Sequence, residues 1–511
     1  MNKRLTRGFI FLTLCCSLLC SFDAVAAVAP IDTTRPRHPE KAPHETLQAD
    51  EPPQGISTAP ETEAGEKNEE SHGGLPAAWS VIPFILLLAM IATGPLFYPH
   101  FWHKYYPVIA AGLGLIVILY YVFVLHNAHQ PIHSLAEYVS FIALIASLFV
   151  ASGGILIEVD KEGKPLVNLL LLIFGAAVAN IIGTTGASML LIRPFIRLNK
   201  GRVQPYHIVF FIFMVSNVGG CLTPIGDPPL FLGFLKGVPF FWTAEFIWPF
   251  WFVGIAIIGL IFYVIDKRQY QKFTPVEPVK YSGRISIRGV KNIGWLAVVI
   301  GAVFLDPNVV DWIPAIVIDG TKFSYIREVI MLATAFLAYK TANPECLKGN
   351  EFDFEPIKEV AYLFIGIFAT MMPALALIGS FAASGEGQKL VTVNSLYWIT
   401  GALSGVLDNA PTYLNFLSAG MGKLGLSIDN KLEVLEYSQR AITELVAISV
   451  GAVFFGAFTY IGNAPNFMVK SIAEQTGIRM PSFVGYIIRY SIPILLPVLF
   501  VVWLVFFHLL S

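Results

Sequence analysis

The sequence from Ser216 to Pro229 reads SNVGGCLTPIGDPP, and this stretch decides the fold. It lies between long apolar runs, yet it contains three glycines, three prolines and the carboxylate of Asp227. Proline removes a backbone donor and glycine weakens a helix, so we expect an α-helix entering here to break. In a bilayer, broken backbone is tolerated only inside protein or beside a water-filled cavity. A carboxylate at such a break predicts a functional site, because mid-membrane charge costs at least about 2.5–3.5 kcal/mol.

The same motif occurs a second time, late in the other half of the chain. Residues 223–231 read TPIGDPPLF and residues 459–467 read TYIGNAPNF, so both fit Thr-x-Ile-Gly-(Asp/Asn)-x-Pro-x-Phe. Interrupted apolar segments at matching positions of two halves are the best sequence indication of a transporter's midplane site. Asn463 takes the place of Asp227, which indicates that the duplicated position serves ligation while only one half keeps the charge.

The composition is that of a polytopic membrane protein. The 511 residues are 55% hydrophobic and 14% charged, with a formal net charge of −1 and a mean hydropathy of +0.65. Soluble domains carry about 25% charged residues. Near-zero net charge argues against a nucleic-acid partner. Of the five cysteines, three lie in the N-terminal apolar run, so neither a disulfide framework nor a metal cluster can be built.

The N-terminal region resembles an export signal followed by a tether. Residues 1–27 have a basic start, an apolar core and a small-residue cleavage site at Ala24–Val25–Ala26, which predict a signal peptide. An uncleaved signal anchor is the alternative. Residues 28–77 are rich in Pro, Glu and Thr, so we expect a disordered periplasmic segment.

Apolar runs predict the order of membrane segments in the first half. Three spans come first, followed by an interrupted run, a broken helix and a last span. These segments lie near 79–98, 107–125, 136–157, 166–198, 205–235 and 241–265.

Basic residues orient these segments. One cluster comprises Arg197, Lys200 and Arg202, and the other occupies the linker at 267–291. Both should be cytoplasmic by the positive-inside rule. With the N-terminus outside, three spans bring the chain into the cytoplasm before the run at 166–198, which must also end there. This run cannot cross an odd number of times, so we expect a re-entrant hairpin with its tip at 183–186.

The second half repeats the order and starts from the opposite side. Its hairpin tip is expected at 407–412, entering from the periplasm. The predicted fold is therefore an all-α polytopic membrane protein with two inverted repeats, 78–266 and 292–511. Each has about five crossings, a re-entrant hairpin and a broken helix. The second set of segments lies near 292–306, 324–340, 358–381, 394–424, 440–472 and 483–509.

The candidate site combines the two breaks with the two hairpin tips. Asp227 and Asp408 are tentative sodium ligands, although each could instead cap the helix that follows it. Arg193 is expected to extend to the cytoplasmic surface, and Glu444 is either a proton relay or an interfacial residue. The other candidate ion-binding residues offer amide, hydroxyl or backbone groups, which also serve helix packing: Asn409, Thr223, Gly226, Asn217, Thr184, Thr185, Thr412, Thr459, Gly462 and Asn463.

With Asn-x-Gly-Gly at 217–220, Ile-Gly-Asp-Pro-Pro at 225–229 and Asp-Asn-Ala-Pro-Thr at 408–412, the chain resembles the Ion Transporter superfamily. That group includes D-type sodium/proton antiporters, arsenite and pink-eyed-dilution permeases, and citrate carriers. The resemblance covers roughly residues 79–509. It departs from the antiporters at Pro228–Pro229 and from the permeases at Leu230, where Asn is usual. It implies a homodimer with a scaffold and an elevator-like transport part that holds both hairpins and both broken helices.

These features predict a secondary active transporter of the bacterial inner membrane, not an enzyme. The leading hypothesis is sodium/proton antiport, because Asp227 and Asp408 suit a hard cation and exchange it for protons. The alternative is sodium- or proton-coupled transport of citrate or another dicarboxylate. A remote alternative is an intramembrane aspartyl protease, whose Gly-x-Gly-Asp signature is broken here by Pro224. No cofactor is expected beyond the transported Na⁺ and H⁺; the expected partners are small ions, a small organic anion in the alternative, lipid and a second copy.

Overall fold

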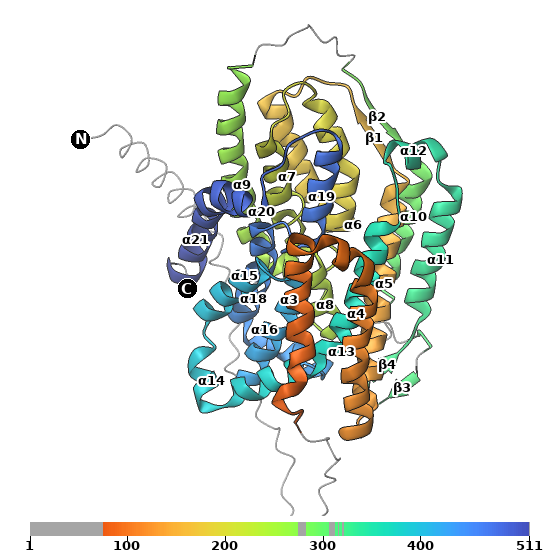
Figure 1. Ribbon diagram of the computed structural model, residues 1–511, viewed down its shortest axis with the longest axis vertical. Helices are drawn as coiled ribbons and strands as arrows, with labels where there is room; N and C mark the ends of the chain where they lie inside the picture. The colour runs from red at the N-terminus through yellow and green to blue at the C-terminus, as the bar shows by residue number, and fades with distance from the viewer. Residues whose placement is uncertain (1–74, 274–282, 306–311, 315, 319–320, 510–511) are drawn as a thin grey trace, which may run out of the picture. The chain divides into compact units, whose positions relative to one another are not determined.

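The computed structural model describes residues 75–273, 283–305, 312–314, 316–318 and 321–509 (Figure 1). The predicted signal peptide and nearly all of the predicted periplasmic segment lie outside the described residues. Within them the chain is almost entirely helical. Eight described helices are long and apolar enough to cross a membrane, or nine if one sharply bent pair counts as a span. The predicted all-α polytopic fold is confirmed.

The described part of the first half contains seven α-helices in the predicted order. A short turn, η3 (Val218–Leu222), separates α7 from α8. The helices are α3 (Ile82–Phe97), α4 (Pro99–Leu119), α5 (His129–Gly153), α6 (Pro165–Leu198), α7 (Pro205–Met214), α8 (Pro228–Lys236) and α9 (Trp242–Tyr270).

The second half repeats this order with added surface helices. The turn η4 (Gly456–Phe458) separates α18 from α19, and η5 (Ile487–Leu495) joins α20 to α21. The helices are α10 (Val290–Val303), α11 (Ile326–Thr341), α12 (Pro344–Gly349), α13 (Glu355–Ala383), α14 (Gly385–Leu390), α15 (Val393–Ser404), α16 (Asn409–Lys423), α17 (Lys431–Arg440), α18 (Ile442–Phe455), α19 (Ala464–Gln475), α20 (Phe483–Tyr486) and α21 (Leu496–Leu504).

Helix α6 folds back on itself, as predicted. Gly183 has φ +78°, a left-handed conformation that side chains other than glycine rarely adopt. The side chains of Asn168 and Asn199 exchange hydrogen bonds of 2.8 and 2.9 Å, so the two ends of α6 lie side by side. The second hairpin is formed by α15 and α16. Its turn lies directly before Asn409, and Asp408 caps α16.

The two broken helices have the same backbone turn. In each, the glycine of the Ile-Gly pair donates its N–H to the motif threonine's hydroxyl: Gly226 to Thr223 and Gly462 to Thr459, both at 3.2 Å. Proline follows within three residues and lies in the first turn of the next half-helix, where a missing N–H costs nothing. The sequence duplication is thus a duplication of structure.

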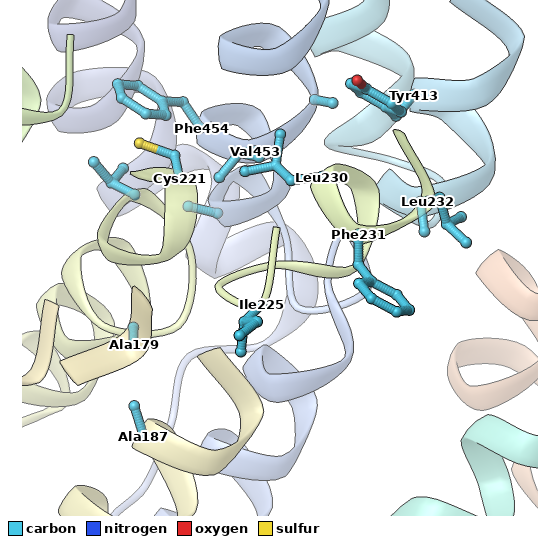
Figure 2. Close-up of a cluster of buried hydrophobic side chains, with 14 of the residues drawn as sticks. Ala179, Ala187, Cys221, Ile225, Leu230, Phe231, Leu232, Tyr413, Val453 and Phe454 are labelled. Carbon is cyan, nitrogen blue, oxygen red and sulfur yellow. The ribbon is translucent and has the colours of Figure 1, made fainter. Parts of the chain in front are cut away.

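Both breaks are closed by contact between glycines. A Cβ placed on Gly226 would lie 2.0 Å from the carbonyl oxygen of Gly220, and one on Gly462 would lie 2.6 Å from that of Gly456. Figure 2 shows apolar side chains around the two breaks, including Cys221 and Ile225 from the first and Phe454 from the second. Buried apolar contacts therefore surround the irregular backbone.

The two ends of the helical bundle differ. The basic end carries Arg197, Arg202 and Arg288, together with α12 and the antiparallel strands β1 (Leu156–Val159) and β2 (Ile285–Arg288), in which Leu156 pairs with Arg288. The opposite end carries α14 and the strands β3 (Ile316–Ile318) and β4 (Thr321–Phe323) (Figure 1). The positive-inside rule predicts that the basic end is the cytoplasmic one.

Replacing Gly226 by alanine should destabilise the protein, because a methyl group has no room beside the Gly220 carbonyl. We expect a loss of about 1–3 kcal/mol or more, as for other overpacked sites, measured as a lower thermal midpoint in detergent. Gly112→Ala in α4 is the control, because an added Cβ there would have no neighbouring atom within 4 Å. Equal midpoints for the two variants would contradict the close packing of the break.

Candidate functional site

The carboxylate of Asp227 is the meeting point of both repeats. Its Oδ1 accepts hydrogen bonds from the Thr184 hydroxyl at 2.8 Å and from the Asn463 amide at 2.9 Å. Its Oδ2 accepts one from the Asn409 amide at 2.8 Å. These donors come from the first hairpin, the second broken helix and the second hairpin. The predicted convergence of two breaks and two tips is therefore present, and Asp227 is only 1% exposed.

Asp227 is free to make these contacts because it does not cap α8 through its side chain. It occupies the N-cap position in an extended conformation, with Pro228 and Pro229 at the first two helical positions. Prolines have no N–H to offer to a capping carboxylate. The Pro-Pro pair thus directs the carboxylate toward the neighbouring segments.

The asparagine at the repeat-related position has a different task. The Asn463 amide nitrogen also approaches the carbonyl of Ser216 at 3.2 Å and the Oδ1 of Asn217 at 3.3 Å. All three of its neighbours are acceptors. A carboxylate at residue 463 would face Asp227 and two further oxygens without a proton to share. This explains why one repeat carries aspartate and the other asparagine.

Two further asparagines support the broken backbone. Asn180 donates to the Gly219 carbonyl at 2.6 Å and accepts from the Leu222 N–H at 2.8 Å. Asn466 donates to the carbonyls of Gly456 and Thr459 and accepts from Asn217 at 2.7 Å. Sequence reasoning alone does not single out Asn466. The available signal for Asn466 is its place in the duplicated motif, opposite Leu230.

The second hairpin tip presents one carboxylate and one amide. Asp408 accepts from the Ala410 N–H at 3.0 Å, and the Thr412 hydroxyl donates to the Asp408 carbonyl at 2.8 Å. Asn409 donates its N–H₂ to Asp227, while its Oδ1 is buried without a hydrogen-bond partner. An unpaired buried acceptor is unusual, and it lies beside the most buried carboxylate of the site.

The predicted threonines divide into two groups. Thr184 contacts Asp227 directly, and Thr185 lines the adjoining cavity. The hydroxyls of Thr223, Thr412 and Thr459 instead bond backbone groups of their own loops or of the neighbouring hairpin. This second group shapes the turns and does not face the carboxylates with a free hydroxyl.

A cavity of about 380 Å³, which we call the vestibule, leads to this site from the basic end. Asp408, Thr185 and Asn463 line its deep end, and the connection from α12 into α13 lines its mouth. Five carboxylates, one guanidinium and one imidazole face it: Asp408, Glu351, Asp353, Glu355, Glu359, Arg193 and His103.

Two charged residues near the site are held by ion pairs. Arg193 does not extend to the surface as expected: it is 8% exposed, faces the vestibule and pairs with Glu351 at 3.0 Å, because α12 and the start of α13 cover it. Glu444 pairs with Lys423 at 2.7 Å and accepts from Tyr437 at 3.2 Å. That ion pair occupies Glu444 away from the vestibule, which does not match a role as a relay to the site.

The deep end of the vestibule is also surrounded by helix N-termini. Pro228 begins α8, Ala464 begins α19, Asp408 caps α16, and Thr185 lies at the start of the second limb of α6. Each helix start carries roughly half a positive charge. These partial charges stabilise ionised carboxylates at the site.

No group of three or more His, Cys, Asp or Glu side chains suitable for a tightly held metal occurs in the described part of the chain.

Comparison with known proteins places this architecture in a transporter family. The model of the family described as "Putative citrate transport" matches residues 74–507. The chain belongs to this family. It is also 23% identical over 326 residues to a "46 kDa membrane protein" of Mycobacterium leprae (strain TN), covering 62% of this chain and 72% of that protein. Uncharacterized transporters of Mycobacterium bovis and Mycobacterium tuberculosis are 23% identical over 329 residues, covering 62% of this chain and 71% of theirs.

Family membership makes the chain a multi-pass membrane protein of a transporter class rather than an enzyme.

Asn463→Asp should destabilise the protein, because it removes a donor and places a second carboxylate against Asp227, Ser216 and Asn217. Leaving buried acceptors unpaired costs about 1–3 kcal/mol, and more for charged groups. A lowered thermal midpoint would be the readout. Asn394→Asp is the matched control, because the Asn394 oxygen accepts from Trp503 and a carboxylate keeps that bond. A midpoint equal to that of the control would refute the donor role of Asn463.

Proposed function

We propose that the protein exchanges a monovalent cation, most simply Na⁺, for protons across the membrane. The observation that carries this proposal is the charge of the vestibule: five carboxylates face the imidazole of His103 and one guanidinium, which is already paired with Glu351. Such a surface concentrates cations and repels anions. Oxygen ligands at its deep end suit a hard cation, which prefers carboxylate, amide and carbonyl oxygens.

In this proposal the two aspartates have different tasks. Asp408 meets the incoming ion, because it lines the vestibule and one of its oxygens has only the Ala410 N–H as partner. Asp227 stays behind it, held by three donors. The Oδ1 of Asn409 has no hydrogen-bond partner, so it is a further oxygen available to the ion while the amide nitrogen stays bonded to Asp227. Protons and the cation then compete for the same carboxylates, which couples their fluxes.

Exchange also requires the opposite end to be closed while the vestibule is open. There the Lys236 ammonium at the end of α8 lies 3.0 Å from Glu137 of α5 and 3.0 Å from Asp429. The Lys236 side chain is 4% exposed and that of Glu137 10%. We propose that these three residues hold α8 against α5 when the basic end is open, and that they separate when the protein turns.

Asp408→Asn should abolish sodium-driven proton movement into proteoliposomes, because the amide can neither bind a proton nor balance the ion's charge. Proton movement would be followed with a lumenal pH dye after a sodium gradient is imposed, and Asp227→Asn is expected to behave alike. Glu386→Gln, on the exposed first turn of α14, should retain wild-type flux. Retained flux in Asp408→Asn would overturn the assignment.

Coupled transport of citrate or a similar carboxylate is the second candidate. The family description favours it, and so do the four helix starts at the deep end of the vestibule, which attract anions. Adding citrate to the same vesicles separates the two. Proton movement that occurs with sodium alone supports antiport, whereas movement that requires citrate replaces it with symport.

Lys236→Met should lower the thermal midpoint strongly, because it removes the ammonium partner of Glu137, whose side chain is only 10% exposed; breaking such a buried pair costs about 3–5 kcal/mol. The double variant Lys236→Met, Glu137→Gln should recover part of this loss. Lys470→Met is the control, since the more exposed Lys470–Glu474 pair contributes only about 0–1 kcal/mol. Additive effects in the double variant would show that Lys236 and Glu137 do not interact.

A further inference from the structure

The walls of the vestibule are mostly apolar between its two charged ends. Residues of α3, α4, α5, α13 and α19 and of the second break supply aromatic and aliphatic side chains there. The aromatic members are Trp102, Phe141, Phe149, Phe364, Tyr460 and Phe467. The middle of the vestibule is therefore apolar, whereas its two ends are charged.

A small inorganic ion does not require such walls. An ion moving through a cavity keeps water or polar ligands around it, and apolar side chains supply neither. The volume of about 380 Å³ also greatly exceeds the roughly 30 Å³ that one water molecule occupies in the liquid. It falls within the roughly 300–1,000 Å³ of pockets that bind small organic molecules. Both features fit an organic occupant.

The charges determine the sign of that occupant. Asp408 lies at the deep end with a carboxylate oxygen facing the cavity, and four more carboxylates lie nearer the mouth. Aromatic faces also attract cations. Two of the wall rings already lie near a cation of the protein itself. The Lys470 ammonium, which pairs with Glu474, is 5.5 Å from the centroid of the Tyr460 ring and 5.7 Å from that of the Phe467 ring.

We propose that the vestibule is a binding site for aromatic organic monocations. The ammonium or guanidinium group contacts Asp408, and one or two rings pack against Phe149, Phe364 and Phe467. Because α13 and α19 both contact the ligand, binding holds the basic end open and blocks exchange. This inference depends on the charge and walls of the vestibule and goes beyond the ion that the protein transports.

Three ligands with one aromatic body test the charge requirement on the full-length protein in detergent. They are 1-naphthylmethylammonium, the neutral 1-naphthylmethanol and the anion 1-naphthylacetate, with binding measured by calorimetry without any ion gradient. The cation should bind about tenfold or more tightly than the neutral compound, as expected for a charge-assisted hydrogen bond. Equal binding of all three, or preference for the anion, would overturn the proposal.

Variants locate the site. Val360→Phe narrows the vestibule without touching a carboxylate and should reduce binding of the cation at least about tenfold, the loss of roughly one such contact. Val329→Phe, at a 63% exposed position of α11, is the matched control and should bind like the wild type. Unchanged binding in Val360→Phe would refute the location. Because binding is measured without transport, a protein that binds the cation but moves no sodium would contradict only the proposed antiport.

Discussion

The structure depends on one buried carboxylate that accepts hydrogen bonds from three separate segments. Asp227 joins Thr184, Asn409 and Asn463, and so connects both hairpins and the second broken helix to the first. Breaking a helix in the membrane leaves backbone polar groups without partners, and a lone charge there is costly. Side chains of the segments that the breaks bring together satisfy the carboxylate. Asn180 and Asn466 satisfy backbone groups that the breaks leave without helical partners.

The two repeats share a backbone but divide the side-chain chemistry between them. Gly226 and Gly462 make the same turn and the same contact with a glycine six residues earlier. At the following position one repeat needs an acceptor and the other a donor, because Asn463 faces only oxygens. A duplicated fold can thus form a single asymmetric site, in which a symmetric pair of carboxylates would repel each other across the shared interface.

The charges around the vestibule bear on which substrate the protein transports. The family description points to citrate, whereas the carboxylates around the cavity favour cations. The helix starts at its deep end carry partial positive charge, but the Asp408 carboxylate already caps α16, and Asp227 directly precedes α8. A trianion would have to displace these two carboxylates or meet them in their neutral form. A cation or a proton would balance their negative charge. The charges that face the cavity therefore support the proposed cation exchange, and we give them more weight than the family description, which points to citrate.

The sequence by itself determined the breaks, their duplication, the hairpin turn at Gly183 and the inverted order of the segments. These features follow from local rules: proline and glycine interrupt helices, apolar length defines spans and basic residues orient them. It also pointed to Asp227, Thr184, Asn409 and Asn463, which the structure brings together, since polar groups at breaks are rare in membrane segments. Only the tertiary structure decided which donors Asp227 binds, that Asn466 supports the second break, that Arg193 is buried and that an acidic, apolar-walled vestibule exists. These depend on contacts between residues far apart in the chain, which no local pattern of sequence specifies.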